Sequence, residues 1–289
     1  MTAIQIRLSE GRDVPILQFL WKWKAVTTSA LCQKFFYDVS PATGFKRLWE
    51  LERAAFIETR TVDDHGKQFA WVLTKKGFAA IRSSLPVLRE EGFRSENLHH
   101  DLLTSAFHLG DWLNARNENA TVISEQQLRR YDFEFYPKAV PKTDLHRPDG
   151  YTYLASPSPK LIAFEVELSP KKKFQYEEVA NFYKRHRVNH ILWLVPRESL
   201  GLRIHQVIGG TLFQDENRHS FLLLTDFIER SWDAKFFIGP HTGQTMNTLL
   251  GNSSETMPKH VSSKFLLDTR KAPHRSGSYR KFSTLSILE

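Results

Sequence analysis

Cysteine is almost absent from this sequence of 289 residues, in which Cys32 is the only one. A single cysteine excludes an internal disulfide and a cysteine-based zinc site, and it fits a reducing compartment. Long apolar runs are also missing. The longest runs, such as residues 191–195, are too short to span a bilayer. The N-terminus lacks the pattern of a signal peptide. We therefore expect a soluble, cytoplasmic protein with no membrane partner.

Acidic residues are fewer than basic ones. The chain has 40 Lys and Arg against 32 Asp and Glu, a formal net charge of +8. A basic surplus favours nucleic acid as a partner, because contacts with phosphates release counterions. A basic protein without a nucleic-acid partner is the alternative. Hydrophobic residues make up 41% of the chain, so one large or two ordinary domains have enough apolar side chains to form a core.

Residues 10–85 show the pattern of a winged helix-turn-helix domain. The expected elements are helices at 13–26, 29–37 and 42–54, strands at 56–62 and 68–73, and a closing helix at 75–81. Local signals support these boundaries, because Ser40 before Pro41 is a good helix cap and Gly66 suits a tight turn. In a winged helix the third helix enters the major groove, and the hairpin tip touches backbone or minor groove.

Four polar residues are the candidates for DNA contact. Thr43, Lys46 and Arg47 lie on the polar side of the third helix, and Lys67 lies at the hairpin tip. We expect them to bind double-stranded DNA. Two alternatives are that these charges only solvate a surface helix, or that the domain binds another protein.

Residues 86–97 are polar and rich in turn formers, so we interpret them as a linker to a second domain at 98–250. That domain opens with a long amphipathic helix, which begins with His99, His100 and Asp101. Adjacent helical positions point about 100° apart. We therefore expect a capping or hinge role for these three residues rather than a metal cluster.

Asp149 and two glutamates form the most distinctive stretch of the chain. Asp149 follows Pro148 at the start of one expected strand, and Glu165 and Glu167 lie in the next strand, at 161–168. Alternate side chains of a strand point to opposite faces, so the two glutamates share one face. Two buried acids favour a cation between them, and a divalent metal with Asp149 as a third ligand is the simplest choice. The alternative is a half-exposed strand with two solvated glutamates.

The other elements of the second domain predict a mixed sheet flanked by helices. We expect helices at 98–115, 123–130, 169–186 and from 198, and strands at 151–154, 190–196, 202–208 and 221–226. The last strand could also be read as the start of a short helix. Residues 251–289 lose periodicity and contain seven basic and three acidic residues. We expect them to form a disordered basic tail that holds DNA without sequence preference.

Pro148-Asp149, then Glu165-Val166-Glu167, then a basic helix resemble the PD-(D/E)XK nuclease superfamily. The resemblance implies an α+β fold of two domains, a winged helix-turn-helix followed by a mixed α/β sheet of restriction-endonuclease-like type. It also implies Asp149 and Glu165 as ligands of Mg²⁺ or Mn²⁺, and Asp149, Glu165 and Glu167 as catalytic residues.

Glu167 departs from that pattern, because most members of the superfamily have lysine at this position. The lysines that could take its place are Lys171 to Lys173 and Lys184. Glu125 lies where some members carry an additional helical acid. The departure leaves two readings open, an active site of unusual composition and a site that has lost catalysis and is kept as a scaffold.

The whole layout is similar to the replication-relaxation family of plasmids and other mobile elements. The similarity covers about residues 12–210 and includes the winged helix, the His-His-Asp run and the two acidic motifs. It implies a DNA-binding protein in plasmid replication control, mobilisation or transcriptional regulation, with a Mg²⁺-dependent endonuclease as the alternative. Double-stranded DNA is the expected partner, and replication or mobilisation proteins and a second copy of the chain are further candidates.

Overall fold

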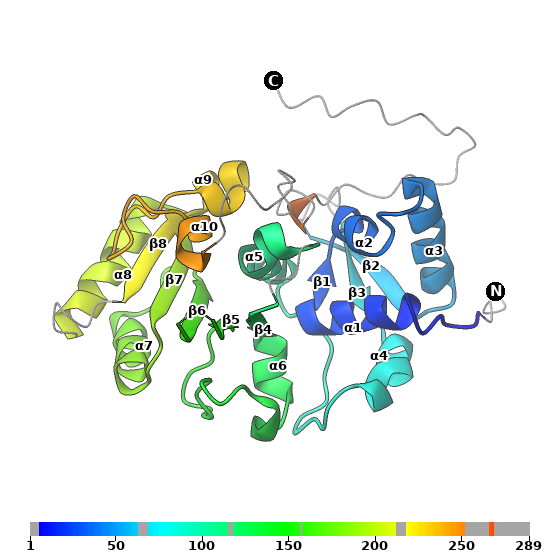
Figure 1. Ribbon diagram of the computed structural model, residues 1–289, viewed down its shortest axis with the longest axis horizontal. Coiled ribbons are helices and arrows are strands. Elements are labelled where there is room, and N and C mark those ends of the chain that lie inside the picture. Colours follow the sequence, from blue (N-terminus) through cyan, green and yellow to red (C-terminus); the bar gives the residue numbers. More distant parts are fainter. Residues whose placement is uncertain are drawn as a thin grey trace.

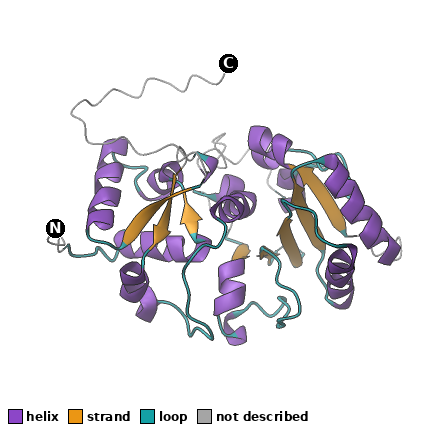
Figure 2. Ribbon diagram, turned by 180° about the vertical axis from the view of Figure 1, so that it is seen from behind, coloured by secondary structure: helices purple, strands orange, loops and turns teal. Residues whose placement is uncertain are grey.

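In a computed structural model of the chain, the structure describes residues 6–62, 69–114, 118–156, 158–211, 218–251 and 266–268. The chain forms two sheets, and helix α5 lies between them in both views (Figures 1 and 2). The fold is α+β, with a mixed five-stranded sheet in its second half. Lys67 and the rest of the expected hairpin tip lie outside the described residues.

The first half follows the predicted order of elements. It contains α1 (Asp13–Trp23), β1 (Ala25–Val26), α2 (Thr28–Phe35), α3 (Pro41–Arg53), β2 (Ile57–Thr61), β3 (Phe69–Leu73), α4 (Lys75–Ile81) and the 3₁₀ turn η1 (Arg82–Ser84). The three strands form an antiparallel sheet in the order β1-β3-β2. Strand β1 was not predicted. It exists because Lys24 adopts a positive φ of 61°, which ends α1 before the expected residue 26.

Side-chain caps mark the starts of α2 and α3, whereas α1 has no side-chain cap. Thr27 accepts a hydrogen bond from the Ala30 amide at the start of α2. Ser40 accepts one from Thr43 at the start of α3, where Pro41 occupies the first helical position. Each cap satisfies an amide that has no partner within the helix. The cap predicted at Ser40 is confirmed, and α2 and α3 each begin one residue before the expected starts at 29 and 42.

The second half is built on the five-stranded sheet. Its elements are α5 (Leu98–Leu109), η2 (Gly110–Trp112), β4 (Ala120–Ser124), α6 (Glu125–Arg130), η3 (Phe133–Phe135), β5 (Gly150–Leu154), β6 (Lys160–Val166), α7 (Lys173–Arg185), β7 (His190–Val195), α8 (Glu198–Thr211), β8 (His219–Leu223), α9 (Leu224–Arg230), η5 (Ser231–Asp233) and α10 (Met246–Leu250). The strand order is β4-β5-β6-β7-β8. Strands β4, β5 and β6 form an antiparallel meander, and β7 and β8 continue parallel to β6.

Strand β6 separates two layers of core. Phe164 belongs to the apolar cluster that contains Phe107 of α5, and Ala163 belongs to the cluster that contains Tyr183 of α7. The first cluster also continues into α1 and β3 of the first half. The two sheets therefore share one continuous apolar core through α5, so α5 belongs to the packing of both halves.

Two predictions of secondary structure are wrong. Residues 202–208 were expected to form a strand, but they lie within α8. The reason is the spacing of the buried side chains Leu200, Ile204 and Ile208, which recur every four residues and so face the sheet in a helix. Residues 120–124 form β4 in front of the short α6, so the helix expected at 123–130 begins two residues late.

Residues 86–97 connect the two halves but do not form a free linker. The Gly92 carbonyl accepts hydrogen bonds from the Trp21 indole and the Gln126 amide, both at 2.9 Å. Phe93 stacks on Phe78. The segment is therefore packed between α1, α4 and α6, and it holds the two halves together.

The expected disordered tail contains a short ordered stretch. Leu266 is completely buried in the shared core, and Asp268 accepts a hydrogen bond of 2.6 Å from the Ser29 hydroxyl of α2. For residues 266–268 the prediction of disorder is therefore wrong. Within the described part of the chain, no helix is both long and apolar enough to cross a membrane.

Candidate functional site

Asp149 is fixed where β4, β5 and β6 meet. Its backbone amide donates to the Phe164 carbonyl, and its own carbonyl accepts from the Glu125 amide, both at 3.0 Å. Carboxylate oxygen Oδ2 accepts a hydrogen bond of 2.6 Å from the Val166 amide. The next residue must be glycine, because a Cβ on Gly150 would come within 2.5 Å of a backbone oxygen of β4. The sequence Asp-Gly thus positions the acid at the end of β6.

His100 of α5 faces this carboxylate. Its Nε2 lies 3.4 Å from Asp149 Oδ1 and 3.1 Å from the Val166 carbonyl oxygen. Burial lowers the pKa of His100, but Asp101 and Asp149 outweigh it and raise the pKa to about 10. Burial likewise opposes ionisation of Asp149, yet His100 and the Val166 amide hold its pKa below the ordinary value. The two groups form an ion pair. The cap of α5 is Asn97 instead, so the expected capping role of His100 is wrong.

Glu165 lies on the α7 side of β6. Its Oε1 accepts hydrogen bonds from His146 Nε2 at 2.7 Å and from the Tyr183 hydroxyl at 2.5 Å. Burial lowers the pKa of His146, but Glu165 raises it above the ordinary value. Burial and the neighbouring Glu165 raise the pKa of Tyr183. His146 and Tyr183 therefore balance the charge of Glu165 with donors of the chain itself. Neither residue was predicted, because the site pattern of the sequence involves acids and lysines only.

Glu167 follows the end of β6 and pairs with Lys171. Its Oε2 lies 2.8 Å from Lys171 Nζ. Burial raises the pKa of Glu167, and Glu165 and Asp149 add to that effect. Burial lowers the pKa of Lys171, but Glu167, Glu165 and Asp149 together raise it. The ammonium group thus lies in the field of all three acids. Among the four candidate lysines, Lys171 contacts Glu167 directly.

The alternation predicted for β6 is confirmed, and the half-exposed alternative is wrong. Phe164 and Val166 face α5, whereas the exposed fractions of Glu165 and Glu167 are only 7% and 3%. Two acids are therefore buried on one side of a strand, and each is paired. Burial of a charge at this depth requires such a partner.

The predicted Mg²⁺ or Mn²⁺ site does not fit this arrangement. Among the described residues, no group of three or more His, Cys, Asp or Glu side chains is placed to hold a metal ion. Mg²⁺ prefers oxygen ligands in an octahedral shell. Here Asp149 points to the Val166 amide, Glu165 to His146 and Tyr183, and Glu167 to Lys171. We call Asp149, Glu165 and Glu167 the carboxylate trio. Each of its three carboxylates faces a different donor of the chain.

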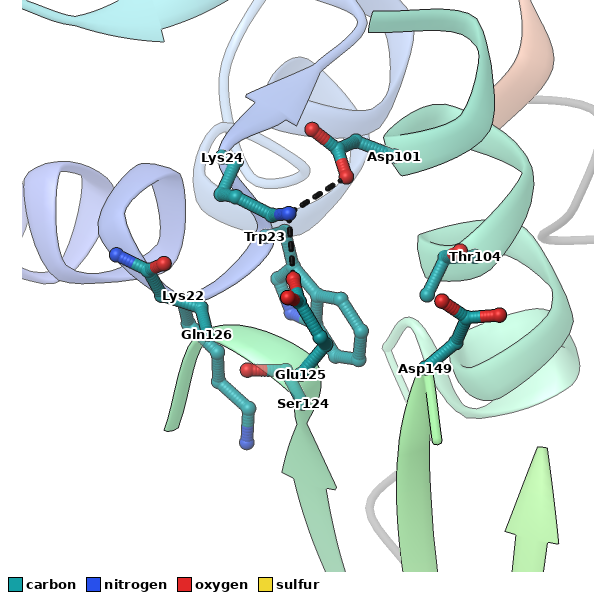
Figure 3. Close-up of a pocket in the computed structure, with 9 residues that line it drawn as sticks. All are labelled: Lys22, Trp23, Lys24, Asp101, Thr104, Ser124, Glu125, Gln126 and Asp149. Atoms are coloured by element: carbon teal, nitrogen blue, oxygen red, sulfur yellow. Dashed lines mark hydrogen bonds and ion pairs between the residues drawn. The ribbon is translucent and has the colours of Figure 1, made fainter. Parts of the chain in front are cut away.

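Glu125 belongs to a separate cluster (Figure 3). The Lys24 ammonium lies 2.8 Å from Asp101 and 2.6 Å from Glu125, and Figure 3 shows it between the two carboxylates. Burial lowers the pKa of Lys24, but the two acids raise it above the ordinary value. The cavity beside them, which Asp149 also lines, has about 10 Å³, room for about one water. Glu125 therefore links α6 to the end of α1, and the cavity is too small for a substrate.

The predicted DNA contacts on α3 separate into two kinds. Thr43 and Lys46 are exposed on its outer face. Arg47 instead pairs with Glu50 at 2.8 Å and with the fully buried Asp13 at 2.5 Å. The hydrogen bond with Asp13 raises the pKa of Arg47 above its ordinary value. Arg47 is thus a structural residue that joins α3 to α1, and its expected contact with DNA is not supported by this geometry.

Comparison with protein-family models, with curated proteins and with solved structures finds no match to the chain.

Proposed function

We propose that the protein binds double-stranded DNA through residues 10–85 as a winged helix and carries a nuclease-like second half that does not catalyse. The observation that carries this proposal is the order α1-β1-α2-α3-β2-β3 around a three-stranded sheet, with Thr43 and Lys46 exposed on α3. This is the order of a winged helix, in which the third helix reads the major groove. Arg53 is also exposed on α3, so it replaces Arg47 among the candidate contacts.

The layout of the second half supports the nuclease-like part of the proposal. The chain forms α5, then the antiparallel strands β4, β5 and β6, with α6 and η3 inserted between β4 and β5, then α7 and the parallel strand β7. In the PD-(D/E)XK resemblance the first acid stands at the start of one strand and the second acid stands in the next strand. Asp149 before β5 and Glu165 on β6 occupy those positions.

The pairing of the acids supports a site that does not catalyse. Asp149 faces His100, Glu165 faces His146, and Glu167 faces Lys171. A divalent ion would have to displace these partners or be bound beside the positive charges of His100 and Lys171, and either event costs electrostatic energy. We infer that the trio now stabilises the sheet, and that the protein acts in replication control, mobilisation or transcription of a mobile element.

A metal-dependent endonuclease is the second candidate, because one observation favours it. Lys171 places an ammonium group beside Glu167, where the superfamily has lysine. A cation there would stabilise the negative charge that develops on a phosphate during hydrolysis. Under this candidate Asp149 and Glu165 would be the ligands of Mg²⁺.

A cleavage assay separates the two candidates. Supercoiled and linear DNA are incubated with the protein and Mg²⁺ or Mn²⁺, alongside Asp149→Ala, Glu165→Ala and Lys171→Ala. The proposed function predicts a mobility shift without nicking in either metal. Nicking by the unmodified protein that all three variants lose, and that Lys138→Ala at an exposed lysine elsewhere keeps, would establish the endonuclease instead.

A further inference from the structure

A basic surface with one bare aromatic ring lies next to the carboxylate trio. Lys171, Lys172 and Lys173 lead into α7 with exposed side chains, and the exposed fraction of Phe174 is 52%. Arg203 of α8 is also exposed and donates a hydrogen bond of 3.4 Å to the Lys171 carbonyl. We call these five residues the α7 entry surface. None of them was assigned to the proposed winged helix, which is in the other half of the chain.

The charge of this surface favours a polyanion. Lys171 pairs with the buried Glu167, and Lys173 lies 3.5 Å from Glu177. The side chains of Lys172 and Arg203 add two further positive charges, so the surface keeps a net positive charge. Closely spaced exposed cations bind a phosphate backbone with release of counterions.

The exposed ring of Phe174 indicates which kind of polyanion this surface binds. A phenyl ring that is half exposed and adjacent in sequence to three exposed lysines offers a flat apolar face on which a base can stack. Base stacking on such rings is characteristic of proteins that bind single strands, because every unpaired base has a free face. In a duplex the bases are stacked on one another, and only the backbone is available to this surface.

We propose that the α7 entry surface binds single-stranded DNA, with the lysines and Arg203 on the phosphates and Phe174 stacked on a base. The inference rests on the proposed function in one respect, that the protein is a DNA-binding protein. It adds a second site of different specificity, so that one half reads duplex DNA and the other holds an unpaired strand. Such a pair of sites fits a junction, where a duplex opens into single strands.

Fluorescence anisotropy with labelled oligo(dT) and a labelled duplex tests the inference on the full chain. Phe174→Ala should weaken oligo(dT) binding by roughly five- to 150-fold, the range expected for one stacked base, and leave duplex binding unchanged. Phe174→Trp should retain oligo(dT) binding. Phe135→Ala removes an exposed aromatic ring elsewhere and should have no effect. Lys172→Ala with Lys173→Ala should weaken oligo(dT) binding and make it less dependent on salt.

The outcomes separate this inference from the proposed function. If Phe174→Ala binds oligo(dT) as well as the unmodified protein does, the stacking site is refuted, even where the lysine variants lose affinity. If the unmodified protein binds the duplex but not oligo(dT), the inference alone fails. Lys46→Ala should weaken duplex binding only. Binding of oligo(dT) that depends on Phe174, without any duplex binding, would support the inference and overturn the winged-helix proposal.

Discussion

Lys171 Nζ lies 2.8 Å from Glu167 Oε2, so the chain supplies a cation to the acid that stands where lysine was expected. The two residues are four positions apart, across the turn that leaves β6 and enters α7. Glu167 is almost fully buried, whereas about half of the Lys171 side chain is exposed. Lys171 therefore neutralises the buried Glu167 carboxylate from the protein surface, and Lys171 can be replaced without opening a cavity.

Replacement of Lys171 by Met should destabilise the fold modestly and in a pH-dependent way. Because Lys171 is half exposed, we expect a loss of about 1 kcal/mol in the free energy of unfolding. Loss of the ammonium raises the pKa of Glu167 further above that of the unfolded chain. The cost should therefore be larger at about pH 8, where Glu167 must ionise unpaired, than at about pH 5. Urea unfolding at both pH values measures this difference.

Two variants control for that experiment. Lys172→Met removes a neighbouring exposed lysine and should leave the stability unchanged. Glu167→Gln combined with Lys171→Met should recover most of the loss, since no buried charge remains. A double variant as unstable as Lys171→Met would show that packing of the lysine stem, rather than charge, is responsible.

The raised pKa of His100 predicts that the free energy of unfolding falls as the pH rises above neutral. Its pKa in the folded protein is about 10, above the ordinary 6.5. A raised pKa stabilises the fold fully below about pH 6.5, and this contribution is lost as the pH rises towards 10. His146, whose pKa is also raised, acts in the same direction.

His100→Gln should flatten this part of the pH profile. We expect the unmodified protein to lose more than about 1 kcal/mol of unfolding free energy between neutral pH and pH 9, and the variant to lose less. Denaturant unfolding across the pH range gives the measurement. His99→Gln is the matched control, because the pKa of His99 is lowered, chiefly by burial. Identical slopes for His100→Gln and the unmodified protein would refute the ion pair with Asp149.

The sequence predicted the acids of the site and named Lys171 among the candidate partners of Glu167, but it did not predict the partners of Asp149 and Glu165. The alternation of β6 is local, so it placed Glu165 and Glu167 on one face correctly. His100 and Tyr183 are brought to the acids by the packing of α5 and α7 on the sheet, and His146 reaches Glu165 from the irregular segment in front of β5. A contact between distant segments leaves no local pattern. The strand predicted at 202–208 is wrong for a different reason: the four-residue spacing of Leu200, Ile204 and Ile208 is local and indicates a helix, in which Leu202 faces solvent with 55% of its surface exposed.

Lys46 and Arg47 are adjacent, yet their replacement should have opposite effects. Arg47→Ala leaves the buried Asp13 carboxylate with the Ser9 amide as a donor but without its cation, and should cost about 3 kcal/mol of stability, as breaking a buried pair does. Lys46→Ala should leave stability unchanged and weaken duplex binding, with a salt dependence reduced by about one unit of slope. Thermal unfolding and anisotropy titrations at several salt concentrations measure both. If the Arg47→Ala protein were stable but bound the duplex more weakly, Arg47 would be a DNA-contacting residue instead of a structural one.

The burial of Leu266 predicts that residues 266–268 contribute to the stability of the fold. Leu266 is completely buried in the core shared by the two sheets, whereas Leu267 beside it is only partly buried. Leu266→Ala should therefore destabilise the protein by about 2 to 4 kcal/mol, within the range for leucine in a packed core. Leu267→Ala should cost clearly less. Equal and small losses in urea unfolding would mean that residues 266–268 do not pack on α2 in solution. The expected difference would make this segment part of the fold, with Asp268 held by Ser29 at the start of the helix that precedes α3.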